Sequence, residues 1–290
     1  MGTATLIEQF QPRVPVGAAC ATGEIITISG YTFGVTYGQN RFTVFDPSSE
    51  TSALYEMTLP FTHLFATQGC PFDGGVAVVA KANGSNPHLL ILYPDGTYDV
   101  YDCGVWWGSG NTQSCGPVDL GGHKIAMWPT GSGYAPRMFD RSTSTWTTWP
   151  TSLSTIQPQV WGGKVWTADG SNVYGRSVAD GSVVTTLSGG FSASGNTVVK
   201  DGELWGRTSY STIGGVDLVT NARHSASIPY DLDSMGMALG ASRLWVANPD
   251  AIYSSDGAAL ETYPHANKGV AGSIHYSNGC AWAMHTAPAS

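Results

Sequence analysis

The chain has little charge and no long hydrophobic run, and each of these features excludes a class of function. Charged residues make up 12% of the 290 residues, and the net charge is −8 at pH 7. Lysine and arginine do not cluster, so the sequence lacks the basic patch that neutralises nucleic-acid phosphates or binds anionic lipid. No stretch of 18 apolar residues is present, as a bilayer-spanning helix would require. We therefore expect neither a nucleic-acid partner nor membrane insertion.

Cysteine is scarce and odd in number, which limits disulfide and metal chemistry. The five cysteines are Cys20, Cys70, Cys103, Cys115 and Cys280. No Cys-x-x-Cys pair exists and the histidines are scattered, so we expect no zinc site and no other cofactor. Cys103 and Cys115 flank a loop and could pair in an oxidising compartment, whereas buried free thiols are the alternative for all five.

The most prominent feature that is present is a short phrase that ends in tryptophan and recurs in the second half of the chain. It reads Gly-Lys-Val-Trp at 163–166, Gly-Glu-Leu-Trp at 202–205, Ser-Arg-Leu-Trp at 242–245 and Gly-Cys-Ala-Trp at 279–282. The tryptophans lie 39, 40 and 37 residues apart. A period of about 40 residues in a chain rich in glycine, threonine and serine is typical of a β-propeller blade.

Weaker copies of the phrase extend the repeat toward the N-terminus. Counting them predicts seven copies, with equivalent positions at Phe33, Val78, Ala126, Trp166, Trp205, Trp245 and Trp282. Because a ligand site does not need one tryptophan per blade, we expect Trp166, Trp205, Trp245 and Trp282 to be structural and to fill the core between blades.

Further strand-like segments follow each phrase. Examples are Arg41–Asp46 with Ala53–Thr58 in the first copy, and Arg137–Asp140 with Thr145–Trp149 in the third. The sequence therefore predicts an all-β, seven-bladed β-propeller of four-stranded antiparallel blades in a single domain, 1–290. The last copy is too short for four strands, so we expect the N-terminal run at about 3–10 to complete it and close the ring.

Residues 163–187 and 242–262 resemble the generic propellers of the NHL, YVTN and streptogramin-lyase type in their Gly-Lys-Val-Trp cadence. The streptogramin-lyase resemblance implies an enzyme with a metal and a general base on the inner loops. The imidazoles available for such a site are His63, His123, His265, His275 and His285. No carboxylate recurs beside them at a ligand spacing, so we interpret them as solvated loop histidines and expect no metal.

A signal-less, lysine-poor propeller rich in glycine, threonine and tryptophan also resembles the minor tail proteins of phages that infect actinobacteria. Residues 1–8 lack a basic segment followed by an apolar core, so we expect no signal peptide. The resemblance implies a virion component near the tail tip, made in the host cytoplasm. Its partners would be other phage tail proteins or a host-envelope glycan.

The candidate binding site is the loop that breaks the period between the second and third copies. Trp106 and Trp107 stand there in a Gly/Ser/Asn-rich stretch that also contains Asn111. Such aromatics stack on sugar rings or anchor a protein partner. The alternative is that Trp106 starts the innermost strand of the next blade and is core.

Three functions remain open at this point. We favour a non-enzymatic tail component involved in tail assembly or host attachment. The first alternative is a bacterial lectin-like or scaffolding propeller. The second is a metal-dependent lyase or hydrolase with its site at the central funnel, which requires clustered histidine and acidic side chains at one mouth.

Overall fold

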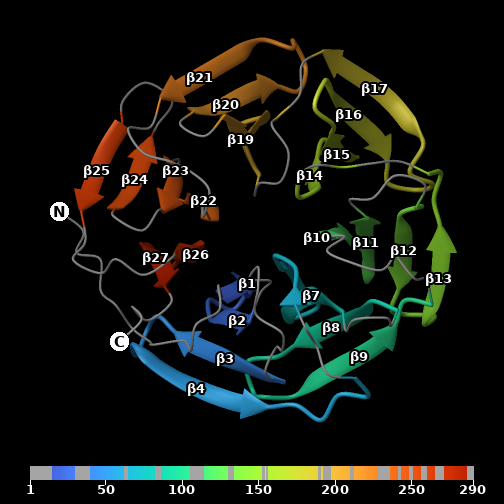
Figure 1. Cartoon of the computed structure of the whole chain (residues 1–290), viewed down its shortest axis with the longest axis vertical. Helices are drawn as coiled ribbons and strands as arrows, with labels where there is room; N and C mark the ends of the chain where they lie inside the picture. Colours follow the sequence, from blue (N-terminus) through green and yellow to red (C-terminus); the bar gives the residue numbers. More distant parts are fainter. Residues whose placement is uncertain are drawn as a thin grey trace.

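Short antiparallel sheets stand around a central axis like the blades of a propeller (Figure 1). The computed structural model describes residues 15–29, 40–61, 65–81, 86–104, 114–129, 134–151, 154, 156–188, 191, 197–209, 212–227, 236–240, 243–247, 251–255, 260–264 and 271–285. In these ranges the strands form seven sheets, and five of them have four strands in sequential order. The propeller class and the four-stranded antiparallel blade predicted from the repeat are therefore confirmed.

The strands are short and follow the chain around the ring. In the first three sheets they are β1 (Pro15–Ala19), β2 (Ile25–Ser29), β3 (Arg41–Asp46) and β4 (Thr51–Glu56); β5 (Phe65–Ala66), β6 (Cys70–Phe72), β7 (Gly75–Lys81), β8 (His88–Leu92) and β9 (Tyr98–Asp102); β10 (Ser114–Gly121), β11 (Lys124–Pro129), β12 (Arg137–Asp140) and β13 (Thr145–Thr148). In the others they are β14 (Gln159–Trp161), β15 (Lys164–Ala168), β16 (Asn172–Ser177) and β17 (Val183–Ser188); β18 (Val198–Lys200), β19 (Glu203–Ser209), β20 (Thr212–Asp217) and β21 (Arg223–Ser227); β22 (Gly236–Gly240), β23 (Arg243–Ala247), β24 (Ala251–Ser255) and β25 (Leu260–Pro264); β26 (Ala271–Ser277) and β27 (Cys280–His285).

The repeated phrase begins with a two-residue turn that joins the first and second strands of a sheet. Both turn residues have positive φ, for example 48° at Asp73 and 83° at Gly74. This is the conformation of a type I′ turn, whose twist matches that of the flanking strands and which favours glycine, asparagine and aspartate. The same turn occurs at Asp73-Gly74, Gly122-His123, Gly162-Gly163, Asp201-Gly202 and Asn278-Gly279.

The tryptophan that ends the phrase lies over a glycine on the next strand. Trp166 pairs with Gly175, and Trp205 pairs with Gly215. Both tryptophans are buried, and a Cβ at Gly215 would stand 2.7 Å from the Trp205 ring. The large tryptophan ring thus fills the space that the glycine, which has no side chain, leaves on the neighbouring strand.

Trp166 also joins two sheets. Its ring belongs to an apolar cluster with Leu204 and Val216 of the fifth sheet, and its indole N–H donates to the carbonyl of Trp161 at 3.1 Å. Trp282 makes the same bond, to the carbonyl of Ser277 at 3.0 Å.

The structure corrects the predicted alignment of the first two copies. β2 is the second strand of the first sheet, so the equivalent of Trp166 is Ile26 rather than Phe33. In the second sheet the hairpin pair Phe72–Gly75 makes the equivalent Ala77, one residue before the predicted Val78. These two copies lack the tryptophan, so they could be aligned only by their spacing from the later copies. Insertions change that spacing, and the predicted positions were therefore shifted.

A series of side-chain-to-backbone hydrogen bonds links the sheets near the axis. Gln68 donates to the carbonyl of Gly17 at 3.1 Å, and Gln157 donates to that of Gly69 at 3.1 Å. Thr197 then donates to the carbonyl of Gln157 at 2.5 Å. Residues that lead into the innermost strands therefore also tie one sheet to another.

The last sheet meets the first, and the ring closes there. β26 lies between β22 and β1, and Trp282 packs edge-on against Phe45 with the ring centroids 5.0 Å apart. The hydroxyl of Ser277 donates to the carbonyl of Gly23 at 2.5 Å. We call these contacts between the last and first sheets the seam. The N-terminal run at 3–10 lies outside the described residues, so its role in completing the last blade stays a prediction.

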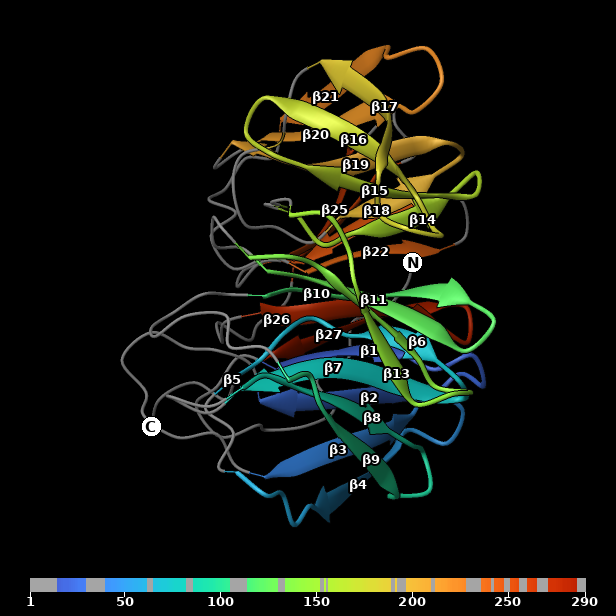
Figure 2. The same cartoon turned by 90° about the vertical axis from the view of Figure 1, so that its right-hand side faces the viewer.

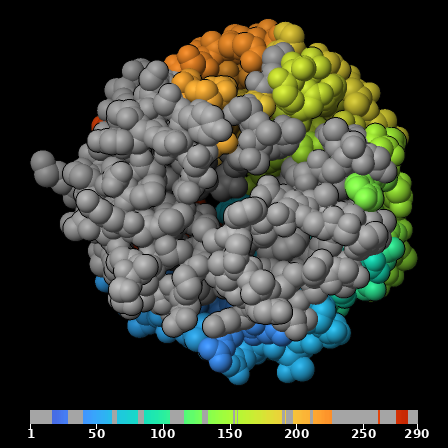
Figure 3. Space-filling model, viewed as in Figure 1, coloured from blue at the N-terminus to red at the C-terminus, as the bar shows by residue number. Residues whose placement is uncertain are grey.

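The tight turns gather on one face of the ring, as the side view shows (Figure 2). Figure 3 shows the opposite face as a surface, with described residues of the first five sheets along its margin. At the rim, the outermost strand of one sheet ends beside the turn that joins the two outermost strands of the next sheet (Figure 1). For example, Trp149, which follows β13, lies against Gly181, where a Cβ would stand 2.5 Å from the ring.

Replacing Gly215 with alanine tests the fit between the tryptophan and its glycine. We expect Gly215→Ala to lower the free energy of unfolding by about 1–3 kcal/mol, because the new methyl group overlaps the buried Trp205 ring. Denaturant unfolding measures the change. Gly170→Ala is the matched control, since a Cβ there meets nothing within 4 Å. Equal stability of the two variants would contradict the packing account.

Candidate functional site

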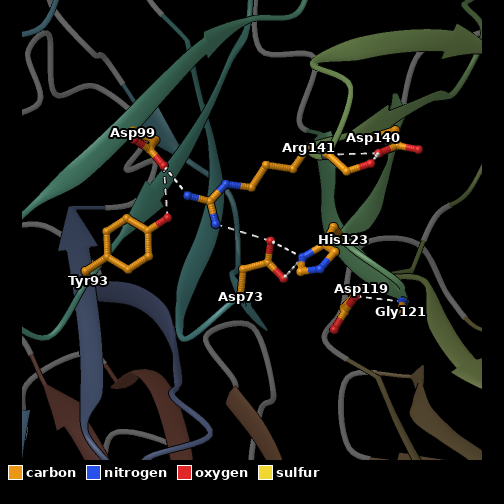
Figure 4. A network of polar contacts seen from close by, with 9 residues as sticks. Asp73, Tyr93, Asp99, Asp119, Gly121, His123, Asp140 and Arg141 are labelled. Atoms are coloured by element: carbon orange, nitrogen blue, oxygen red, sulfur yellow. Dashed lines mark hydrogen bonds and ion pairs between the residues drawn. The ribbon is translucent and has the colours of Figure 1, made fainter.

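A network of polar contacts lies between the second and third sheets on the face with the tight turns (Figure 4). Arg141 is its centre, and its guanidinium donates to Asp99 Oδ2 at 2.7 Å and to Asp73 Oδ2 at 3.2 Å. Tyr93 donates to the same Asp99 oxygen at 2.9 Å. Nδ1 of His123 lies 3.0 Å from Oδ1 of Asp73. We call these five residues the polar joint.

Local turns place four of these side chains, and Asp99 lies in β9. Asp73 and His123 stand in the two-residue turns before β7 and β11, Tyr93 follows β8, and Arg141 follows β12. Arg141 is held by the turn that Asp140 organises, in which Oδ1 of Asp140 accepts from the backbone N–H of Ser142 at 3.0 Å. The polar joint is therefore assembled from segments of two different sheets.

Burial differs strongly within the polar joint. The side chain of Asp73 is 14% exposed, and that of His123 is 65% exposed. Burial raises the pKa of Tyr93, and the hydrogen bond to Asp99 raises it further, so the phenol stays protonated. Burial and the nearby charge of Asp73 raise the pKa of Asp119, which accepts from the backbone N–H of Gly121.

A histidine paired with a carboxylate can transfer protons, and the polar joint contains such a pair. Hydrolysis would also require a nucleophile or a metal-bound water. Within the described ranges, no three His, Cys, Asp or Glu side chains group closely enough to hold a metal ion. Asp73 and Asp99 are both engaged by Arg141, and the geometry is that of a bridge between sheets.

The binding residues predicted from the sequence, Trp106, Trp107 and Asn111, lie outside the described residues, so their role stays a prediction. The innermost strand of the third sheet begins at Ser114. On the N-terminal side of this loop, Asp102 accepts a hydrogen bond from the backbone N–H of Gly104 at 2.7 Å.

The predicted core tryptophans are placed in their sheets. Trp166 and Trp205 are buried, and Trp282 is half-buried against Phe45. Trp245 lies in β23, and its side chain is outside the described residues.

The histidines considered for an axial metal site do not share one environment. His123 belongs to the polar joint, whereas His275 is buried in β26 opposite Trp282. Burial lowers the pKa of His275 to about 4, so its imidazole is neutral at neutral pH. His63, His265 and the side chain of His285 lie outside the described residues.

Buried cysteines are free thiols in the structure. Cys20, Cys70 and Cys103 are buried and Cys280 is exposed. Cys103 therefore forms no disulfide here, and its sulfur lies 4.0 Å from that of Met127. Burial and, to a smaller extent, the charge of Glu24 raise the pKa of Cys20 to about 12, which keeps this thiol unreactive.

Sequence reasoning missed the partners in the polar joint because they come from four separate turns and one strand. A local signal did exist for the turn that positions Arg141. Asp46, Asp140 and Asp217 each accept turn hydrogen bonds, and the residue four places later has positive φ, as at Ser144 with 54°. Recurrence of this aspartate-led turn marks the outer end of several sheets.

Comparison with known proteins supports the fold. No family model and no curated protein matches the chain. Among solved structures, BamB from Moraxella catarrhalis matches with a TM-score of 0.58 and 12% identity, over 94% of this chain and 83% of that one. A chain in a crystal structure of a mitotic checkpoint complex matches with a TM-score of 0.61 and 11% identity, over 95% of this chain and 84% of that one. Identities this low show a shared β-propeller fold. In the described ranges, no helix has the length and hydropathy needed to cross a membrane.

Removing the Arg141 guanidinium tests whether the polar joint holds two sheets together. We expect Arg141→Ala to lower the free energy of unfolding by about 1–2 kcal/mol, because two carboxylates lose a charged donor. Arg41→Ala is the control: Arg41 pairs with Glu56 on the exposed surface, and its loss should change stability by less than about 0.5 kcal/mol. If both variants lose the same free energy of unfolding, the polar joint contributes no more to stability than an exposed ion pair does.

His275 makes stability depend on pH. The unfolded imidazole titrates near 6.5 and the folded one near 4, so the folded protein is favoured above pH 6.5 and loses stability as the pH falls. Between pH 6.5 and 4 we expect a loss of about 3 kcal/mol. Denaturant unfolding across this range, compared with His275→Gln, measures the effect. Parallel profiles for the two proteins would contradict it.

Proposed function

We propose that the protein is a non-enzymatic interaction propeller that binds other proteins through its outer rim. The observation that carries the proposal is a set of exposed apolar side chains on the outer strands and turns: Leu54 in β4, Val183 and Val184 in β17, and Val219 in the turn before β21. Val184 is 55% exposed and Val219 is 73% exposed. Exposed apolar groups at a sheet edge favour contact with another protein.

The edge formed by β17 is the strongest candidate surface. A bulge places Val183 opposite Arg176 and Thr185 opposite Gly175, so Val184 is the additional residue and both valines are exposed. β17 and β13 carry no charged residue, whereas β4, β9, β21 and β25 do, and of the two uncharged strands only β17 exposes aliphatic side chains. Charge on an edge strand opposes pairing with other chains, so β17 is the least protected of these edges.

The propeller neighbours are compatible with this role. One of them is a chain of a mitotic checkpoint complex and so forms part of a larger assembly. The assembly that we propose for the present protein is a phage tail. The low charge, the abundance of glycine and tryptophan, and the resemblance to minor tail proteins support a place in the virion near the tail tip. Its partners there would be other tail proteins, and its exposed loops would contact a host-envelope glycan.

Incorporation into virions tests the proposal. We expect an antibody against this chain to label intact particles near the tail tip, and a chain carrying Val183→Asp and Val184→Asp to be lost from particles. Buried charge at a protein interface costs several kcal/mol, which explains the expected loss. Thr148→Asp, on the exposed part of β13, is the matched control and should be incorporated normally.

The outcomes separate the two parts of the proposal. Absence of the wild-type chain from purified particles would refute the tail assignment. Normal incorporation of the double variant, with the wild type present, would show that β17 is not the docking edge. Far-UV circular dichroism and the thermal midpoint of each purified variant establish that it is folded.

A further inference from the structure

The turn between β26 and β27 brings a reactive dipeptide to the surface at the seam. Asn278 and Gly279 are both exposed, with φ of 48° and 77°. Asn278 Nδ2 also donates to the carbonyl of Pro47 in the first sheet, at 3.5 Å. One side chain thus belongs both to a hairpin turn and to the contact that closes the ring.

We propose that Asn278 is a site of spontaneous deamidation, which converts a seam contact into a negative charge. The backbone nitrogen of Gly279 attacks Cγ of Asn278, the new N–Cγ bond forms and the Cγ–Nδ2 bond breaks. The proton of the Gly279 nitrogen leaves with the amide as ammonia. Water then opens the cyclic imide to aspartate or isoaspartate. Glycine favours the attack because it has no Cβ to hinder the approach.

The aspartate product fits the turn, because two equivalent turns in this chain already contain it. Asp73-Gly74 and Asp201-Gly202 have φ values of 48° and 83°, and of 52° and 84°. Isoaspartate places an additional methylene in the backbone and cannot keep a two-residue turn in register. The modification therefore yields one product that leaves the hairpin intact and one that disrupts it.

Either product weakens the seam. A carboxylate accepts hydrogen bonds but donates none, so the bond from position 278 to the carbonyl of Pro47 is lost. Asp46 precedes Pro47 and is itself a carboxylate, which accepts from Ser48 at 2.8 Å. The new charge therefore faces a carbonyl oxygen and lies near a like charge. In the aspartate product Ser277 and Trp282 keep their contacts with the first sheet, so that product loosens the seam without opening it.

The chain contains a matched asparagine with a different neighbour. Asn221 also stands in a turn with positive φ, 60°, and its Nδ2 also donates to another sheet, to Ser188 Oγ at 3.0 Å. It is followed by Ala222, whose Cβ hinders the attack. The two sites therefore share a positive φ and an amide hydrogen bond to another sheet, and they differ in the turn around them and in the following residue.

Peptide mapping by mass spectrometry tests the reaction on the folded full-length protein during incubation at mildly alkaline pH. We expect the Asn278 peptide to gain the acid form at least about tenfold faster than the Asn221 peptide. Asn83-Gly84, the other Asn-Gly pair in the sequence, is followed in the same digest. The proposal is overturned if Asn278 stays intact over a time in which the urea-unfolded chain converts it.

Two variants test the consequence for the seam. Asn278→Asp mimics the product, and Asn278→Gly removes the amide without adding charge, in a turn that Gly162-Gly163 shows to be compatible with the fold. We expect the thermal midpoint of Asn278→Asp to lie about 1–3 °C below that of Asn278→Gly, and added salt to narrow the gap by screening the charges. Equal midpoints at low salt would refute the effect on the seam. This inference goes beyond the proposed function and does not depend on it.

Discussion

Face-to-face burial between neighbouring sheets is the contact on which the ring depends. A four-stranded sheet with apolar side chains on both faces is stable only when another sheet covers each face. Trp166 meets this need by packing against Leu204 and Val216 of the following sheet. In an open row of such sheets the two end faces would stay exposed to water. The contact of β26 with both β22 and β1 removes those ends, so closure follows from the packing.

Polar contacts then determine how the outer parts of neighbouring sheets meet. Because the sheets twist, the outermost strand of one sheet points toward the turn that joins the two outermost strands of the next sheet. In the polar joint this brings Asp99 of β9 within 2.7 Å of Arg141, which follows β12. Carboxylates engaged in this way are satisfied by the fold itself. The polar joint thus ties the second sheet to the third.

Strand positions were predictable wherever turn chemistry and alternation agreed. The segments Arg41–Asp46 and Arg137–Asp140 were predicted with the bounds that the structure has. The first copy of the repeat was misplaced because Ile26 stands where later copies have tryptophan. The polar joint was not predictable, since Asp73 and Arg141 are 68 residues apart and no local pattern relates them.

The amino-acid order contains the local information: the period of the turns, the strands that follow them and the tryptophan opposite a glycine. These depend on neighbours within about 40 residues and on backbone conformations that glycine and asparagine favour. The three-dimensional structure alone determined which residues distant in sequence lie side by side. It put His275 in a buried strand and Asn278 at the seam beside Pro47. The reason is physical, because burial and contact between sheets depend on how the ring closes, and residues from both ends of the chain meet only then.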